Sequence, residues 1–362
     1  MVPTEVLEAY HIPVEQCRIE PFGNGHINDT FRITPEGDSH QYILQRINHY
    51  VFVHPEQVME NIDRVTCFLR KKIREEGGDP ERETVTVIGT GDGHLSCGDA
   101  AGNTWRCLLF VPDTISYDQP ETLEHLEECG RVFGLFSRRL HDFPAETLHE
   151  TILQFHDTPN RVKQLQEAVD RNASGKLDEV RGELAFAMDR AEKTTLLLQM
   201  NKQGKIPIRV THNDTKVNNV LFDRRSEKAV CVVDLDTVMP GLMAYDFGDA
   251  IRVGASTAPE DERELSRMHL DLEKYEAFAR GFLGELRDVL SQEEVLSLAI
   301  GAWLMTLENG LRFLADHLNG DVYFKIHRDN QNLDRARAQF ALVADMEQHQ
   351  AEMESILLKY AK

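Results

Sequence analysis

"RVTHNDTKVNNVLFD", residues 209–223, is a polar run that ends in an apolar stretch of β type, and another such stretch, 206–208, precedes it. Its polar side chains include His212, Asp214, Lys216 and Asn219. Asn and Asp are common in turns because they tolerate left-handed backbone and hydrogen-bond to their own main chain. On local grounds the run is either a hydrophilic turn or a loop whose side chains are spaced for a reaction. The rest of the sequence decides between these two interpretations.

The composition is that of a soluble globular protein with two structural parts. The chain has 362 residues, of which 41% are hydrophobic and 28% are charged, and it is too apolar for disorder. A length above the usual single-domain size predicts two lobes. The formal net charge of −21 argues against a nucleic-acid partner, because phosphate backbones bind basic surfaces.

Three features predict a cytoplasmic protein with no membrane partner. The N-terminus lacks the basic region and apolar stretch of a secretory signal. The most apolar segment, 295–307, is too short to span a bilayer and predicts a buried helix. The cysteines are scattered without a Cys-x-x-Cys pair, which predicts reduced core thiols and neither a zinc site nor a disulfide framework. They are Cys17, Cys67, Cys97, Cys107, Cys129 and Cys231.

The pattern changes from strands to helices along the chain. Residues 19–34 predict two short strands joined by a glycine-containing turn, and further strands are predicted at 41–48, 84–90 and 104–112. Helical spacing of apolar residues predicts helices at 55–76, 121–140, 160–170, 177–202, 260–290, 292–318 and 332–361. Short β-type runs at 206–210, 220–222 and 229–236 interrupt the helical part. We therefore predict an α+β fold with a small β-rich lobe over residues 1–112 and a larger, mainly helical lobe over 113–362.

The strand that follows the opening stretch indicates a reaction. His212, Asp214 and Asn219 fit the pattern His-x-Asp-x-x-x-x-Asn, and Asp234 comes at the end of the next β-type run. In phosphoryl transfer, such an Asp accepts the proton of an attacking hydroxyl, while an Asn and a second Asp hold Mg²⁺ on the nucleotide phosphates. A carboxylate base and hard oxygen donors are the groups that this chemistry needs.

Six blocks of sequence extend this pattern over nearly the whole chain. They are GNGHIN at 23–28, YILQ at 42–45, RVTHNDTK-NN at 209–219, DLDT-MPG at 234–241, DFGD-IR-GAST at 246–257 and RFLAD-L-GDVYF at 312–324. Together they resemble the aminoglycoside-phosphotransferase (APH)-like kinases, and within them the bacterial N-acetylhexosamine 1-kinases. The resemblance implies a two-lobed protein-kinase-like fold, ATP and Mg²⁺ as cofactors, and phosphorylation of the anomeric 1-hydroxyl of N-acetylglucosamine or N-acetylgalactosamine.

The same resemblance implies a role for each matching residue of the opening stretch. Asp214 resembles the catalytic base, and Asn219 and Asp234 resemble the Mg²⁺ ligands. Lys216 is positioned to offset the charge of the transferring phosphoryl group, and its alternative is a solvated turn lysine. We expect His212 to support the loop through hydrogen bonds.

A second acidic motif, Asp246-Phe247-Gly248, has the letters of the protein-kinase metal motif. It lies farther from the loop than that motif should, and Asp234 occupies the expected place after the next strand. We therefore expect Asp234 to bind the metal. The resemblance implies that Asp246, like the later Asp of these kinases, is a buried acid that braces the catalytic loop.

The N-terminal part offers residues for the nucleotide. Gly23 and Gly25 would let the first hairpin turn approach the phosphates closely. The backbone of Phe110 and Val111, at the end of the strand 104–112, is expected to bind adenine.

One residue departs from the usual pattern of these kinases. They carry a Lys on the third strand, which pairs with the nucleotide phosphates and a helix Glu. Here Gln45 occupies that place, with Arg46 beside it and Glu60 as a weak candidate for the helix partner. Strand alternation puts Gln45 and Arg46 on opposite faces. The sequence leaves open which of them replaces the lysine.

The last block concerns the sugar. Arg312 and Tyr323 are implied as sugar contacts, together with Asp214. Helical periodicity alone would make Arg312 an exposed side chain. Val253 and His317 stand where the resemblance implies aromatic residues, so we expect a wider pocket.

Three other functions stay open. Another kinase of the same superfamily would act on homoserine, choline, a methylthio-sugar or an aminoglycoside. A pseudokinase scaffold is favoured by the missing Lys and opposed by the intact Asp214, Asn219 and Asp234. A metallohydrolase would use His141-Asp142 and His156-Asp157, but no second pair at metal-ligand spacing accompanies either of them.

Overall fold

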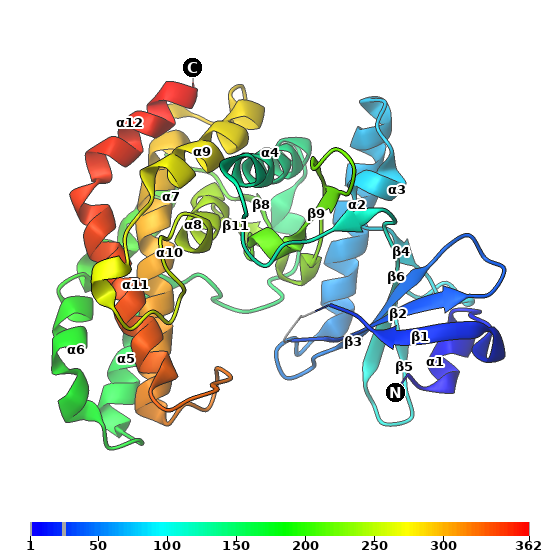
Figure 1. Cartoon of the computed structure of the whole chain (residues 1–362), viewed down its shortest axis with the longest axis horizontal. Helices are drawn as coiled ribbons and strands as arrows, with labels where there is room; N and C mark the ends of the chain where they lie inside the picture. Colours follow the sequence, from blue (N-terminus) through cyan, green and yellow to red (C-terminus); the bar gives the residue numbers. More distant parts are fainter. Residues whose placement is uncertain (1, 24–26, 362) are drawn as a thin grey trace. The chain divides into compact units, whose positions relative to one another are not determined.

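The computed structural model describes residues 2–23 and 27–361 and divides the chain into two compact units (Figure 1). The first unit comprises Met1–Ser116, Arg139–Leu153 and Asn219–Pro240. The second comprises Tyr117–Arg138, Gln154–Asn218 and Gly241–Lys362. The chain is 52% helical and 13% strand, with a sheet in the N-terminal part and helices in the C-terminal part, which confirms the predicted α+β class.

An antiparallel sheet forms the centre of the first unit. The strands pair in the order β1-β2-β3-β6-β4, and β5 pairs with β6. This register places Gln45 of β3 between Thr30 of β2 and Arg106 of β6. A short helix that the sequence did not predict, α1, buries Val6 and Leu7 in the core beside the sheet. The elements are α1 Thr4–Ala9, β1 Cys17–Pro21, β2 Asp29–Pro35, β3 Tyr42–Ile47, β4 Val87–Ile88, β5 Cys97–Gly98 and β6 Thr104–Leu109.

Helix α2, Pro55–Glu75, is the long helix of the first unit and matches the predicted 55–76. Pro55 opens it, where the missing N–H of proline costs nothing. Its buried Asn61 accepts a hydrogen bond from the His149 amide at 2.9 Å and donates to the carbonyls of His149 and Val238, at 2.8 and 2.9 Å. These bonds join α2 to the two later segments of the unit.

A three-stranded antiparallel sheet completes the first unit, in the order β10-β9-β7. It consists of β7 Thr114–Ile115, β9 Val220–Asp223 and β10 Ala229–Val232. The predicted strand 229–236 ends four residues early, because Asp234 adopts a left-handed conformation, with φ 60° and ψ 57°, and η6, Leu235–Thr237, follows. Asp tolerates this conformation better than most residues.

Helices build the second unit around α10 (Figure 1). Ser291 caps this helix in a capping box with Glu294, and Gly320 ends it with φ 94°. Helices α8 and α10 approach closely, since a Cβ on Gly248 would lie 2.3 Å from the Gly301 carbonyl oxygen. The helices are α4 Leu123–Arg139, α5 Thr158–Arg171, α8 Met243–Gly254, α9 Leu272–Leu286, α10 Gln292–Asn319, α11 Gln331–Gln348 and α12 Gln350–Tyr360.

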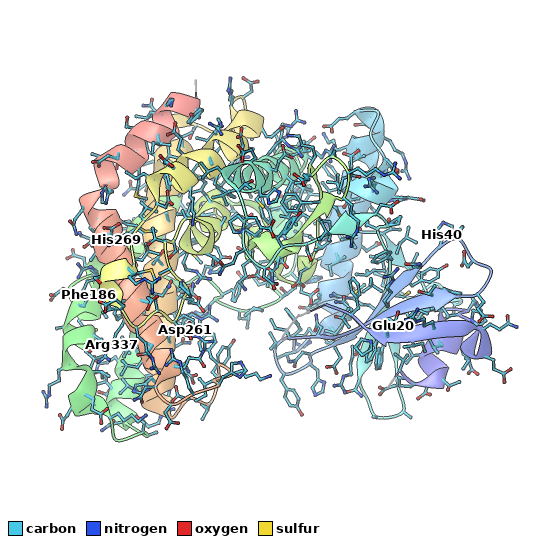
Figure 2. The ribbon with its side chains drawn as sticks, in the orientation of Figure 1. Glu20, His40, Phe186, Asp261, His269 and Arg337 are labelled. Carbon is cyan, nitrogen blue, oxygen red and sulfur yellow. The ribbon has the colours of Figure 1, made fainter. Side chains whose placement is uncertain are left out.

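The predicted helix over 177–202 is wrong in its continuity. Four short helices replace it: η3 Leu177–Val180, α6 Arg181–Met188, η4 Ala191–Thr195 and α7 Leu196–Lys202. The hydroxyls of Thr194 and Thr195 donate to the carbonyls three residues earlier, at 2.6 and 2.8 Å, and such bonds compete with helix formation. Phe186, labelled in Figure 2, stacks on Phe340 of α11 at 5.0 Å, so α6 packs against that helix.

The predicted helix over 260–290 is helical only over α9 and the short η7, Leu265–Arg267. The segment before α9 bonds to α11 instead: Gln331 donates to Asp261 at 2.9 Å, and His269 Nδ1 lies 3.2 Å from Asp345 Oδ1. Figure 2 labels Asp261 and His269 of this segment. Asp271 then caps α9 by accepting from two backbone amides. The predicted helix 332–361 is divided into α11 and α12. The remaining elements are η1 Val14–Gln16, α3 Pro80–Glu83, η2 Ala145–Thr147, β8 Arg209–Thr211, η5 Val217–Asn219 and β11 Met239–Gly241.

The cysteines differ in burial, and the most apolar run of the chain lies inside a helix. All six cysteines are unpaired thiols; Cys107, Cys129 and Cys231 are buried, whereas Cys67 is exposed. The prediction of core thiols therefore fails for Cys67. Among the described residues, none of the helices has the length and apolar character needed to span a bilayer. The apolar run 295–307 lies within α10, as expected for a buried helix.

Candidate active site

The loop that follows β8 in the second unit is built on buried polar groups. His212 is fully buried, its ring packs edge-on against Phe133 at 5.6 Å, and its Nδ1 accepts the Asp214 amide at 3.2 Å. Asn213 takes a left-handed φ of 65°, which Asn tolerates better than most residues. The His212 ring thus contacts both the loop backbone and Phe133 of α4, and its supporting role stays a prediction.

Asp246, near the start of α8, accepts hydrogen bonds from the backbone of this loop. Its side chain is almost wholly buried, and its two carboxylate oxygens accept the backbone amides of His212 and Asn213 at 2.8 and 2.7 Å. The Thr215 hydroxyl donates to the Asp246 carbonyl at 2.5 Å. Burial raises the pKa of the Asp246 carboxyl, while His212 and the two backbone amides act against that shift. These are the contacts that a bracing role requires.

Asp214 and Lys216 form an ion pair at the surface of the loop. Lys216 Nζ lies 2.6 Å from Asp214 Oδ1, and the side chains are 42% and 24% exposed, respectively. The Asp214 carboxylate raises the pKa of Lys216, against the effect of burial. Lys216 therefore carries its positive charge beside the carboxylate that the sequence predicts as the base, and both groups are reachable from solvent.

Asn219 and Asp234 belong to the first unit and are brought together by the main chain. The Val233 amide donates to the Asn219 carbonyl at 2.9 Å, which places Asp234, the next residue, beside Asn219. Asn219 is buried, whereas Asp234 is exposed. Their amide and carboxylate oxygens are hard donors that suit Mg²⁺. The described residues contain no group of three or more His, Cys, Asp or Glu side chains that could hold a metal. A small protein ligand set fits Mg²⁺, which usually takes one or two carboxylates and completes its shell with water and phosphate oxygens.

The proposed nucleotide contacts are only partly described. Gly23 has φ 76°, a conformation that favours glycine, and Gly25 lies outside the described residues. At the end of β6, the Phe110 amide donates to the Gln41 carbonyl and the Val111 carbonyl accepts from Thr114. Within the described ranges, the Phe110 carbonyl and the Val111 amide make no hydrogen bond. One acceptor and one donor of the backbone thus remain at the position expected for adenine.

The two candidates for the missing lysine have different environments. Gln45 Nε2 donates to Thr30 and its Oε1 accepts from Arg106, at 3.0 and 2.9 Å. Arg46 pairs instead with Asp29, and both of those side chains are about half exposed. Glu60 lies 2.8 Å from a His149 ring nitrogen in a solvent-exposed contact. Arg106, which the sequence analysis did not select, is the buried cation next to Gln45.

The predicted sugar contacts lie on α10 and the loop after it. Arg312 is half-buried, and its guanidinium lies over the rings of Phe324 and Phe155, at 5.3 and 5.8 Å. The expectation of an exposed arginine from periodicity alone is therefore wrong. Tyr323 is 67% exposed. Asp316 fixes this loop, because its carboxylate accepts the amides of residues 322, 323 and 324 at 2.8–3.0 Å.

A buried hydrogen-bond network connects α10 with the loop that follows β8. Glu308 accepts the Thr158 hydroxyl at 2.6 Å and lies 2.9 Å from His156 Nδ1, while His156 Nε2 lies 3.4 Å from the Asn213 carbonyl oxygen. The adjacent Asp157 caps α5. His156 and Asp157 thus have structural partners, as expected for residues at a helix end.

Other side chains singled out in the sequence are placed as follows. Asp142, the partner of His141 in the metallohydrolase alternative, bonds to Lys72 at 2.7 Å. Val253 is half-buried, and His317 is fully buried. Burial lowers the pKa of His317. The expectation of a wider sugar site stays a prediction.

Comparison with known proteins places the fold. The model of the "Phosphotransferase enzyme family" matches residues 18–281. A microcompartment-associated aminopropanol kinase matches with a TM-score of 0.64 at 16% identity over 97% of each chain. An aminoglycoside phosphotransferase from Alicyclobacillus acidocaldarius matches with 0.61 at 14% identity, over 99% of this chain and 96% of that one. A Plasmodium vivax ethanolamine kinase matches with 0.55 at 13% identity, over 90% and 83%. The APH kinase-like fold expected from the sequence is thereby confirmed.

Proposed function

Because the chain belongs to the phosphotransferase enzyme family, we propose that it transfers the γ-phosphoryl group of ATP to the anomeric 1-hydroxyl of an N-acetylhexosamine. The product would be N-acetylglucosamine 1-phosphate or N-acetylgalactosamine 1-phosphate. In this proposal the nucleotide contacts lie within residues 1–112, and the catalytic loop and the sugar contacts lie within 113–362.

Asp214 is the proposed base. It would accept a hydrogen bond from the sugar hydroxyl and take its proton as the oxygen attacks phosphorus. Lys216, already charged beside Asp214, would stabilise negative charge on the transferring group. Asp246 and His212 would keep the Asp214 backbone in place, because positioning accounts for much of the catalysis in phosphoryl transfer.

Asn219 and Asp234 would hold Mg²⁺ on the nucleotide. The ion would supply positive charge that neutralises the phosphate oxygens. The Phe110 carbonyl and Val111 amide would hydrogen-bond to adenine. Gly23 would let the backbone approach the phosphates without a side chain in the way.

The observation that carries the choice of acceptor is the environment of Arg312. Its guanidinium lies over two aromatic rings. Burial lowers the pKa of the neighbouring Arg161, and the charge of Arg312 lowers it further. Arg312 and Arg161 would repel a cationic acceptor, against the attraction of the nearby Glu308 and Asp157 carboxylates. Amines such as ethanolamine, choline or an aminoglycoside carry a positive charge. A neutral sugar instead offers hydroxyl groups, which Arg312 and Tyr323 can bind by directional hydrogen bonds, and an apolar ring face for the aromatic side chains.

The test is to incubate the protein with Mg-ATP and separate acceptors, and to locate the transferred phosphate by ³¹P NMR. We expect phosphate on C1 of free N-acetylglucosamine or N-acetylgalactosamine. Aminopropanol, ethanolamine, choline, homoserine, a methylthio-sugar and an aminoglycoside serve as competing acceptors, and Asp214→Asn serves as the control for contaminating kinases.

Methyl glycosides of the same sugars provide the critical comparison, because they lack the hydroxyl that is attacked. If they are phosphorylated as well as the free sugars, the anomeric assignment is wrong. Preferential phosphorylation of an amine would overturn the choice of acceptor, and absence of turnover on every acceptor would favour a nucleotide-binding scaffold.

A further inference from the structure

Arg106 is a buried arginine on β6 of the six-stranded sheet. Arg106 lies on β6 between Trp105 and Cys107, and its side chain is only 2% exposed. The register places it directly opposite Gln45 of β3. Charged side chains are almost never fully buried unless they are paired. The partners of Arg106 therefore indicate why it is there.

Arg106 has two polar partners, one on each side. Its Nε donates to Gln45 Oε1 at 2.9 Å, and Gln45 is held in turn by Thr30. Its Nη1 donates to Asp236 Oδ1, and the Asp236 side chain is 4% exposed. Gln45 thus serves as a neutral acceptor that orients the guanidinium toward Asp236.

Asp236 is fixed from two further directions. Its other carboxylate oxygen accepts Asn28 Nδ2 at 2.7 Å, and its backbone carbonyl accepts the Thr151 hydroxyl at 3.1 Å. Asn28 Oδ1 also accepts the Asn48 amide at 2.9 Å. Asn28 directly precedes β2, so the network joins the connection between β1 and β2, the end of β3, and η6.

Asp236 connects this network to the proposed metal ligand Asp234. Asp236 lies in η6, the single turn that begins directly after Asp234, and Asp234 has a left-handed backbone. An exposed residue in an uncommon conformation keeps it only where its surroundings hold it. The Arg106–Asp236 pair anchors the turn two residues beyond Asp234. A buried ion pair is itself weak evidence for stability, because the charges lose their hydration, so a positioning role explains it better.

Given the proposed function, we propose that Arg106, which lies opposite the place of the absent third-strand lysine, is the positioning residue of the Asp234 turn. It acts through Asp236: the fixed guanidinium sets the direction in which the Asp234 carboxylate is presented to a Mg-nucleotide. Gln45 is the acceptor that orients Arg106. Arg46 has no part in this, because its partner Asp29 and its own side chain are about half exposed.

The test compares two arginines on neighbouring strands. Arg106→Gln and Asp236→Asn are the test variants, and Arg46→Gln and Asp29→Asn are the matched controls. Binding of Mg-ADP to the whole protein is measured by calorimetry, with and without Mg²⁺, and thermal unfolding is followed in parallel. In Mg²⁺ we expect about 10- to 100-fold weaker ADP binding for both test variants, the usual effect of changing a group that orients a metal ligand. In EDTA we expect their ADP affinity to stay within about threefold of the unmodified protein, since the direct phosphate contacts remain.

Two results would overturn the proposal. Equal losses with and without Mg²⁺ would mean that Arg106 contacts the phosphates directly. Unchanged Mg-ADP affinity in folded Arg106→Gln would make the pair purely structural. The control variants should bind as the unmodified protein does, and a loss in Arg46→Gln alone would make Arg46 the replacement for the lysine.

A double variant that replaces both charges of the Arg106–Asp236 pair distinguishes a loss of positioning from a folding defect. Arg106→Met combined with Asp236→Leu removes the buried pair without leaving one charge unpaired, and such replacements commonly retain stability. We expect this double variant to fold and still to bind Mg-ADP about 10- to 100-fold more weakly. Full recovery of both stability and affinity would refute positioning. No acceptor takes part in these measurements, so failure of the sugar assignment and failure of this proposal give different results.

Discussion

Replacing Asp246 with Asn tests whether this acid braces the catalytic loop or binds the metal. Its carboxylate is buried and accepts the backbone amides of His212 and Asn213. The amide group of Asn has one oxygen, so one of the two backbone donors would face an N–H group. Losing a hydrogen bond to a charged acceptor and leaving a buried donor unpaired costs about 2–3 kcal/mol. For a unit of this size that corresponds to a fall in Tm of about 4–12 °C.

The functional consequence of Asp246→Asn should differ from its effect on stability. We expect kcat to fall because the Asp214 backbone is held less firmly, while the affinity for Mg-ADP changes by less than about threefold, since no metal ligand is lost. Asp234→Asn should do the reverse: Mg-ADP binding weakens, and the free energy of unfolding changes by no more than about 0.5 kcal/mol, as for most exposed positions.

Calorimetric unfolding and Mg-ADP titration of both variants give the comparison. Our assignment of the two acids is refuted if Asp246→Asn loses Mg-dependent binding at an unchanged Tm. A nucleotide complex with the metal on Asp246 would refute it directly.

Three further predictions concern the second unit. Asp214→Asn should lower kcat by about 10²–10⁴ and keep Mg-ADP binding; near-normal turnover would remove Asp214 from the mechanism. Arg312→Met should raise KM for the sugar and leave KM for ATP unchanged in steady-state assays, and a parallel rise in both would contradict a sugar contact. Although burial alone would raise it, the pKa of Glu308 lies below its ordinary value of 4.5 because His156, Thr158 and Arg312 favour the carboxylate. The stability from this shift is present above pH 4.5 and is lost as the pH falls through the lowered pKa. Urea unfolding should therefore show Glu308→Gln about 1–3 kcal/mol less stable at pH 7, because Thr158 and His156 lose a carboxylate acceptor, and less sensitive to pH below 4.5; equal acid sensitivity would exclude Glu308.

Long periodic segments could be predicted from the sequence because their burial is decided locally. Helix α2 was predicted within one residue at its C-terminal end, since its apolar positions recur at helical spacing and Pro55 marks its start. Helix α10, Gln292–Asn319, was predicted as 292–318, and the structure adds Ser291 as its cap. Residues 177–202 have similar helical propensity, but threonine hydroxyls there bond to nearby carbonyls and divide the segment. The helical spacing of apolar residues gives no information about that competition.

The roles proposed for Asp234 and Asp246 came from the order of the motifs along the chain and not from periodicity. Asp234 follows the strand after the loop, and the main-chain bond between Val233 and Asn219 places it beside the other proposed ligand. Asp246 has the letters of a metal motif but is enclosed in α8, with both oxygens taken by backbone amides. The assignment of Asp234 to the metal rests on its position after the strand β10 and stays a prediction.

The partners of Arg106 could not be predicted from the sequence. Its partners Gln45 and Asp236 lie 61 and 130 residues away, and Asp236 is joined in turn to Asn28, 208 residues away. Alternation along β3 correctly separates Gln45 from Arg46, but the residue opposite Gln45 depends on which strand pairs with β3 and in what register. A slip of one residue would put Trp105 or Cys107 there instead and turn the guanidinium to the other face. The one available signal was an arginine inside the apolar strand TWRCLLF, since a charge in such a place needs a partner. That signal predicts that a partner exists, but only the folded chain shows that the register places Gln45 opposite Arg106 and that η6 supplies Asp236, two residues from the proposed metal ligand.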